Sequence, residues 1–146
     1  MHAERTIVVA RPAEVVFEYI ASGPRTAEWR EGVRELALMT SSIGEGAVYR
    51  QVIGGPAGHD VDCDYVITRY DPPRRLEFAV VAGPARPTGS FELTERDGRT
   101  QVRFCLDAAP RGLRRLLAPL WSRALRAEVA QLDRLKSVLE SERSVV

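Results

Sequence analysis

Residues 91–106 read FELTERDGRTQVRFCL, two alternating runs on either side of an Asp-Gly pair. Apolar and polar side chains alternate with a period of two in both runs, which is typical of β-strands with one buried face. Asp97-Gly98 tolerates the positive φ angles of a two-residue type I′ turn. The stretch therefore predicts an antiparallel hairpin, and its buried face would carry Phe91, Leu93, Val102, Phe104 and Leu106. Cys105 has the opposite parity and is placed on the outer face.

The same pattern extends over residues 33–109, where β-like runs are separated by turn residues about every ten positions. These turns lie at residues 44–46, 54–58, 71–73 and 83–84. Such a succession predicts an antiparallel meander of six strands. Leu76, Phe78 and Val80 would face inward on one of them. For residues 48–53 the pattern does not decide which side chains face inward. The inward set is either Val48, Arg50 and Val52 or Tyr49, Gln51 and Ile53.

Residues 59–67 read HDVDCDYVI and are predicted as one strand. The apolar side chains that alternate with the aspartates are expected to be buried, so the aspartates are predicted to lie on a solvated face. A metal site is the alternative for the aspartates, but ligands from a single strand cannot surround an ion. The inward set is Val61, Cys63, Tyr65 and Ile67, and the outward set is Asp60, Asp62 and Asp64.

The N-terminal segment changes from a strand pattern to a helix pattern. Ile7 to Ala10 is a β-branched run, and Pro12 suits the first turn of a helix over residues 13–20. Gly23-Pro24 ends that helix, and a second short helical turn is predicted around residues 27–29.

The C-terminal segment, from Leu113 to about Glu142, carries apolar residues at spacings of three and four, which predicts one long amphipathic helix. Pro119 removes a backbone donor, so a kink or a short helix before a longer one is expected there. The helix is the element large enough to cover the apolar face of the sheet. Arginines between its leucines are interpreted as a charged outer face rather than as a membrane-binding surface.

Composition limits the class of protein. The chain has 146 residues, 45% of them apolar, and its 21 Lys+Arg and 20 Asp+Glu give a net charge of +1. This size fits one domain over residues 1–146. Near-neutral charge offers no general attraction to nucleic acid. No stretch reaches the length of a bilayer span and no export signal is visible, so a cytoplasmic protein without stable membrane insertion is expected.

Side chains for catalysis or metal binding are sparse. His2 lies at a start that we expect to be flexible, and His59 lies at a strand edge, so neither is placed as a catalytic base. Cys63 and Cys105 lack the Cys-x-x-Cys spacing of a zinc or redox site. The glycine turns lack the Gly-Lys-Ser/Thr ending of a phosphate loop. We predict no cofactor and no metal site.

Taken together, these segments resemble the START-like SRPBCC superfamily, and within it the bacterial polyketide cyclase/dehydrase-type proteins. The resemblance covers nearly the whole chain. It rests on the order and spacing of several weak motifs. These are the opening IVVARPAEVVF at residues 7–17, Trp29 before Gly32-Val33, DPPRRL at 71–76, Asp97-Gly98 with Thr100-Gln-Val102, and RGL and LAPL at 111–113 and 117–120.

The resemblance implies an α+β helix-grip fold. A seven-stranded antiparallel sheet would wrap around a long C-terminal helix, with two short helices after the first strand and a hydrophobic cavity between sheet and helix. In that fold the strands of Cys63 and Cys105 stand about 14 Å apart at normal strand spacing. A disulfide requires Cα atoms within about 7 Å, so free thiols are expected.

The main functional hypothesis is the binding of a lipid- or polyketide-like molecule in that cavity, by a carrier or sensor. Its contacts would be Trp29, Tyr49, Cys63, Tyr65, Ile67, Phe78, Phe91, Phe104, Leu120 and Trp121. The alternative is a polyketide cyclase or dehydratase, in which Arg50 polarises a carbonyl and Tyr65 or Tyr49 donates a proton. A homodimer formed through the sheet or the last helix is a third possibility.

Overall fold

The structure is a computed structural model that describes residues 1–54, 58–83, 86–108 and 118–143. Its central hairpin joins β7 (Thr88–Arg96) to β8 (Arg99–Asp107), with Phe91 opposite Phe104. Asp97 and Gly98 have φ angles of 55° and 76°, as a type I′ turn requires. The hairpin predicted from the sequence is confirmed. All five side chains of its predicted inner face are buried.

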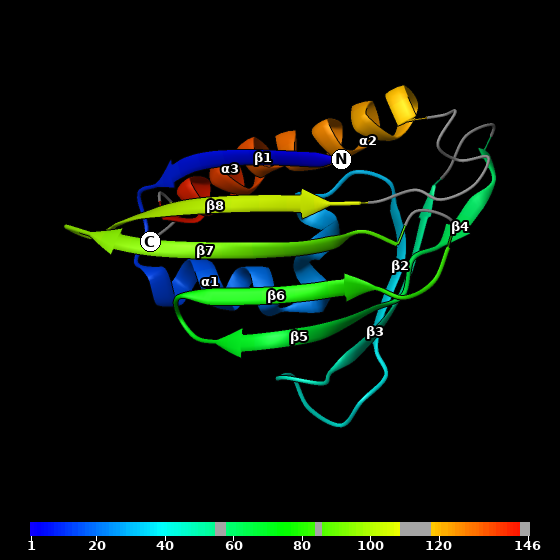
Figure 1. The fold of residues 1–146 in the computed structure, drawn as a ribbon. Helices are drawn as coiled ribbons and strands as arrows, with labels where there is room; N and C mark the ends of the chain where they lie inside the picture. The colour runs from blue at the N-terminus through cyan, green and yellow to red at the C-terminus, as the bar shows by residue number, and fades with distance from the viewer. Residues whose placement is uncertain (55–57, 84–85, 109–117, 144–146) are drawn as a thin grey trace.

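The antiparallel sheet follows the order β1-β8-β7-β6-β5-β3-β2, and the short β4 pairs with β3 (Figure 1). The predicted meander and seven-stranded order are therefore confirmed. The remaining strands are β1 (His2–Val9), β2 (Val33–Leu38), β3 (Val48–Gly54), β4 (Asp60–Asp62), β5 (Tyr65–Asp71) and β6 (Arg75–Val80).

β1 starts earlier than the sequence predicted. Its pairing with β8 extends from Val9 opposite Thr100 to His2 opposite Asp107. The amino group of Met1 donates a hydrogen bond to the Ala108 carbonyl at 2.7 Å. His2 was expected in a flexible start, and that expectation is wrong because β8 holds it in a strand.

The single strand predicted over residues 59–67 is also wrong, because the structure has two pieces, β4 and β5. Between them, the backbone N–H of Gln51 donates to the Asp64 carboxylate at 3.1 Å. The Cys63 N–H donates to the Gln51 carbonyl at 2.7 Å. A side-chain oxygen thus takes the place of a strand carbonyl, which interrupts the ladder at this point.

Two short helices follow β1, as predicted: α1 (Ala13–Ala21) and the 3₁₀ helix η1 (Gly23–Glu28). The C-terminal segment forms α2 (Ala118–Ala130) and α3 (Leu132–Arg143), which both pack against β1 (Figure 1). Pro119 lies in the first turn of α2, and the kink expected there involves residues 109–117, which lie outside the described ranges.

Within the described residues, the C-terminal helix is interrupted at Gln131. There the Gln131 N–H donates to the carbonyl of Glu128, three residues earlier, and the Gln131 side chain accepts a hydrogen bond from the Glu31 N–H. The contact with Glu31 is a tertiary one, which the helical periodicity does not show.

The C-terminal helices pack against β1, and α2 also contacts β8. Leu132, Leu135 and Leu139 are fully buried, together with Val9 and Val102. Each buried leucine side chain contributes about 1.5–3 kcal/mol through the hydrophobic effect. No described helix is long and apolar enough to cross a membrane.

Candidate ligand-binding site

A row of aromatic rings crosses the inner face of the sheet, with one ring from each of five neighbouring strands. Tyr49 and Tyr65 stack at a centroid distance of 4.9 Å, and Phe91 stacks on Phe104 at 4.3 Å. Phe78 joins the two pairs, at 5.7 Å from Tyr65 and 6.2 Å from Phe91. The structure therefore brings together five of the predicted ligand contacts. They form one continuous apolar wall.

Gly89 makes room for the middle of this row. Gly89 pairs with Phe78 on β6 and with Leu106 on β8. A Cβ atom at position 89 would lie 2.3 Å from Phe78 Cζ and 2.9 Å from Leu106 Cδ2. The Phe78 ring occupies this space, so a side chain at position 89 would push it out of the row.

Trp29, just after η1, packs edge-on against Phe91 at a centroid distance of 6.3 Å. The side chain is buried, with a relative exposure of 2%. Its indole Nε1 has no hydrogen-bond partner among the residues that the structure describes. An unsatisfied buried donor costs about 1–3 kcal/mol, so this atom is a candidate contact for a ligand oxygen.

A polar cluster lies beside the aromatic row. Arg30 donates to the Glu128 carboxylate on α2 at 2.6 Å and to Gln51 Oε1 on β3 at 2.8 Å. The Gln51 amide in turn donates to the Cys63 carbonyl at 3.1 Å. The guanidinium charge is therefore paired with a carboxylate, and the amide of Gln51 has partners at both of its ends.

Sequence reasoning missed Arg30 and Glu128. One signal was available, because Glu128 lies between Leu125 and Leu132 at helical spacing and so interrupts the apolar stripe. A carboxylate at such a position needs a cation nearby. The partner Arg30 is far away in the sequence, so the periodicity alone could not identify it.

The side chains of Tyr65, Tyr49 and Cys63 stay protonated near neutral pH. Burial raises the pKa of Tyr65 well above its usual value, and the positive charge of Arg30 opposes this effect only in part. Burial also raises the pKa values of the Tyr49 hydroxyl and the Cys63 thiol. The Tyr49 hydroxyl donates to the Ala21 carbonyl at 3.2 Å. Tyr65 is thus available as a neutral hydrogen-bond donor.

The parity of β3, which the sequence left open, places Tyr49 and Gln51 on the inner face. Arg50 consequently lies on the outer face, where its guanidinium is 3.9 Å from Glu35. Arg50 therefore does not share the inner face with Tyr49 and Tyr65, the proton donors of the cyclase hypothesis.

The remaining predicted contacts have different surroundings. Ile67 is buried in the core, and Cys63 is half-buried beside Gln51. Leu120 and Trp121 belong to α2, but their side chains lie outside what the structure describes. Both thiols are free, as predicted.

A separate cavity of about 480 Å³ lies beside α1. Its walls include Glu14, Phe17 and Glu18 of α1, with Ile43 and Tyr70 across from them. None of the predicted ligand contacts lines it. No pattern in the sequence indicated this cavity, because its walls come from three separate segments.

Comparisons with known proteins concern the family and the fold. Residues 1–140 match the model of a family described as polyketide cyclase / dehydrase and lipid transport. A search of curated proteins found no match.

Solved structures share the fold at low sequence identity. NE0264 from Nitrosomonas europaea is 14% identical, with a TM-score of 0.75 over 99% of this chain and 97% of that one. DR_A0006 from Deinococcus radiodurans is 15% identical, with a TM-score of 0.71 over 97% and 99% of the two chains. A START superfamily protein from Mycobacterium smegmatis is 12% identical, with a TM-score of 0.71 over 99% of each chain.

Proposed function

The chain belongs to the polyketide cyclase / dehydrase and lipid transport family, and from this we propose that it binds an apolar small molecule carrying a neutral oxygen. The molecule lies against the aromatic row, between the sheet and the C-terminal helices. The protein acts as a carrier or sensor of a lipid- or polyketide-like compound.

The observation that carries this proposal is the indole N–H of Trp29, which has no hydrogen-bond partner in the described part of the chain. It is buried at the edge of the aromatic row, with Phe91 against its ring. A carbonyl or hydroxyl oxygen of a ligand satisfies this donor, while the apolar body of the ligand covers the phenylalanine rings. The protonated hydroxyl of Tyr65 offers a second donor in the same interior.

The charge pairing supports a neutral ligand over an acidic one. Arg30 is a cation beside the aromatic row, and its guanidinium donates hydrogen bonds to Glu128 and Gln51. A carboxylate ligand would have to displace Glu128, leaving a partly buried carboxylate without its cation. An alcohol, ketone or ester needs no such exchange.

The test compares two ligands of equal chain length, dodecanol and dodecanoate. The wild-type chain is titrated, because Trp121 is itself a predicted ligand contact, and the fluorescence of its two tryptophans reports binding. We expect saturable binding of one dodecanol per chain, with dodecanoate at least about tenfold weaker. Failure of both to bind, by fluorescence and by native mass spectrometry, contradicts the proposal.

Native mass spectrometry also addresses the class of natural ligand. The protein is purified under non-denaturing conditions, then denatured, and the released compound is identified. A stoichiometric neutral lipid or polyketide supports the proposal. A stoichiometric acidic or strongly polar compound contradicts it.

The cyclase alternative has less support. Arg50 faces outward, the Tyr49 hydroxyl is held by a carbonyl, and burial makes Tyr65 a weaker acid than usual. A hydroxyl of this kind can orient a carbonyl group, whereas general acid catalysis needs a pKa near the working pH.

A further inference from the structure

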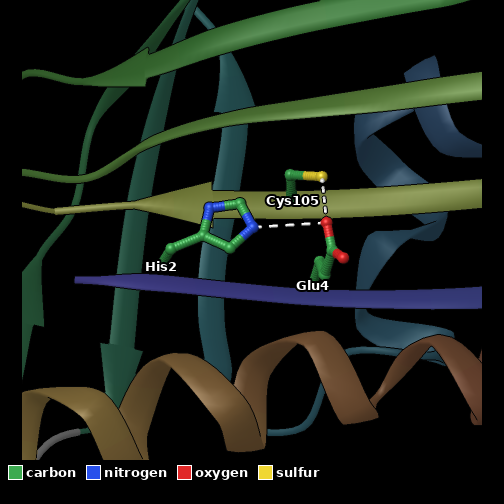
Figure 2. A group of neighbouring side chains, drawn as sticks. All are labelled: His2, Glu4 and Cys105. Atoms are coloured by element: carbon green, nitrogen blue, oxygen red, sulfur yellow. Dashed lines mark hydrogen bonds and ion pairs between the residues drawn. The ribbon is translucent and has the colours of Figure 1, made fainter.

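The outer face of the β1–β8 pair gathers three side chains that bind metals in proteins. His2 and Glu4 lie on β1 and Cys105 lies on β8, directly opposite Glu4. The period of two places all three on the face opposite to Ala3 and Phe104, which are buried inside. Figure 2 shows the imidazole and the thiol directed at the Glu4 carboxylate from either side.

Two of the three distances between ligand atoms in this cluster match those around a tetrahedral zinc ion. His2 Nε2 lies 3.2 Å from Glu4 Oε2, and Cys105 Sγ lies 3.6 Å from the same oxygen. Zinc bonds of about 2.0 Å to nitrogen and oxygen and about 2.3 Å to sulfur place these ligand atoms about 3.3 and 3.5 Å apart. All three ligand atoms lie within 4.8 Å of one another.

We propose that His2 Nε2, Glu4 Oε2 and Cys105 Sγ form a zinc-binding site on the outer face of the sheet, with a fourth position open to water. One nitrogen, one sulfur and one oxygen donor suit Zn²⁺ better than Ca²⁺ or Mg²⁺, which take oxygen ligands. His2 and Glu4 are about half exposed, so the ion can enter from solvent.

A fourth residue orients the histidine. Asp107 Oδ1 lies 2.6 Å from His2 Nδ1, the ring nitrogen that does not face the cluster. A carboxylate that accepts a hydrogen bond from Nδ1–H fixes the tautomer in which Nε2 carries the free lone pair. Asp107 therefore acts as a positioning residue, in the arrangement common behind zinc-bound histidines.

The charge of Arg103 opposes cation binding at this site. Its guanidinium donates to Glu4 Oε2 at 2.6 Å and lies 3.5 Å from Glu92. Glu4 and Asp107 place two carboxylates in the cluster beside this guanidinium, and Glu92 is shared between Arg103 and Arg75. Removing the guanidinium should therefore tighten metal binding, whereas a purely structural role of the cluster predicts no such gain.

The test is a titration of the full chain, without an N-terminal tag and with reduced thiols, using Co²⁺ as a spectroscopic substitute for Zn²⁺. Tetrahedral Co²⁺ bound by a thiolate gives visible d–d bands and a near-ultraviolet charge-transfer band. We expect both bands to saturate at one ion per chain and to disappear when Zn²⁺ is added.

Variants then assign the ligands. Cys105→Ser should abolish the charge-transfer band. His2→Gln changes an exposed side chain, so it remains a test even if Cys105→Ser folds poorly, and it should weaken binding more than about tenfold. Asp107→Asn should weaken binding by about tenfold, and Arg103→Gln should strengthen it. The matched controls, Cys63→Ser and His59→Gln, should keep the spectrum and the affinity.

Two results overturn the proposal. One is the absence of saturable Co²⁺ and Zn²⁺ binding at micromolar protein. The other is a spectrum that Cys105→Ser and His2→Gln leave unchanged, because the ion would then be held elsewhere.

Discussion

The inner and outer faces of strands β6, β7 and β8 carry opposite chemistry. Inside, Phe78, Phe91 and Phe104 form part of the aromatic row. Outside, Arg75 on β6 and Arg103 on β8 both pair with Glu92 on β7, and Arg103 continues to Glu4 on β1. The same period-two alternation thus produces a water-excluding wall on one side and an ion-pair ladder on the other.

The electrostatics of the two faces also differ. Burial raises the pKa of Tyr65 on the inner side, whereas the hydrogen bond from Arg103 lowers the pKa of Glu4 on the outer side to about 2. Burial thus favours the neutral form of Tyr65, whereas Arg103 favours the charged form of Glu4. Stability should therefore depend on the inner face, while the charged groups of the outer face remain free to exchange partners.

The strongest test of this contrast is deletion of one side chain on each face of β8. Phe104→Ala should lower the free energy of unfolding by about 3–5 kcal/mol, because a buried ring is replaced by a cavity. Its neighbour Arg103→Ala should have a much smaller effect, because the ion pairs of Arg103 are exposed and screened. Urea unfolding of both variants measures the difference. Comparable losses for the two would refute the assignment of stability to the inner face.

The next test adds a methyl group instead of removing a ring. Gly89→Ala should cost about 1–3 kcal/mol, because its Cβ would overlap the Phe78 ring and Leu106. Displacing Phe78 should also weaken the binding of dodecanol. Thermal unfolding and the fluorescence titration check the two effects. A fully stable variant that still binds dodecanol normally would show that Phe78 can leave the row without consequence.

A third change removes one donor from the inner face. Trp29→Phe keeps an aromatic ring but lacks the indole N–H, so the affinity for dodecanol should fall about tenfold, the value of one hydrogen bond. Calorimetry measures this affinity without the tryptophan signal. Ile43→Asp is the control, because it places a charge in the cavity beside α1. If Ile43→Asp weakens binding and Trp29→Phe does not, the ligand occupies that other cavity.

The sequence predicted those parts of the molecule that depend on alternation and on turn chemistry. Residues 91–106 contain most of both strands and the whole turn of their hairpin, so local pattern and tertiary structure agree there. The inward set of the aromatic row followed from parity, except on β3, where Tyr49 and Arg50 were equally compatible with the pattern. Pairing of β3 with its neighbours resolves that choice.

What the sequence did not predict depends on contacts between distant segments. Arg30, Gln51 and Glu128 meet only because η1, β3 and α2 converge. The break at Gln131 accompanies a hydrogen bond to Glu31, and the interruption after β4 accompanies the hydrogen bond to Asp64. His2 and Cys105 come together because β1, the first strand in the sequence, pairs with β8, the last one. Spacing rules for metal ligands in a sequence do not cover residues so far apart.

The smallest expected effect is a pH dependence that belongs to the inner face. Burial raises the folded-state pKa of Tyr65 above the ordinary value of 10.0, so Tyr65 contributes stability that is fully present below pH 10.0. This contribution is lost as the pH rises from there toward the folded-state pKa, because the unfolded chain can release the proton and the folded chain resists doing so. Tyr65→Phe should therefore reduce the loss of stability above pH 10.0 and leave its pH dependence near neutrality unchanged. Urea unfolding at a series of alkaline pH values measures the slope. Identical slopes for the wild type and the variant would mean that the Tyr65 hydroxyl is in contact with water, and that the polar end of the site is open.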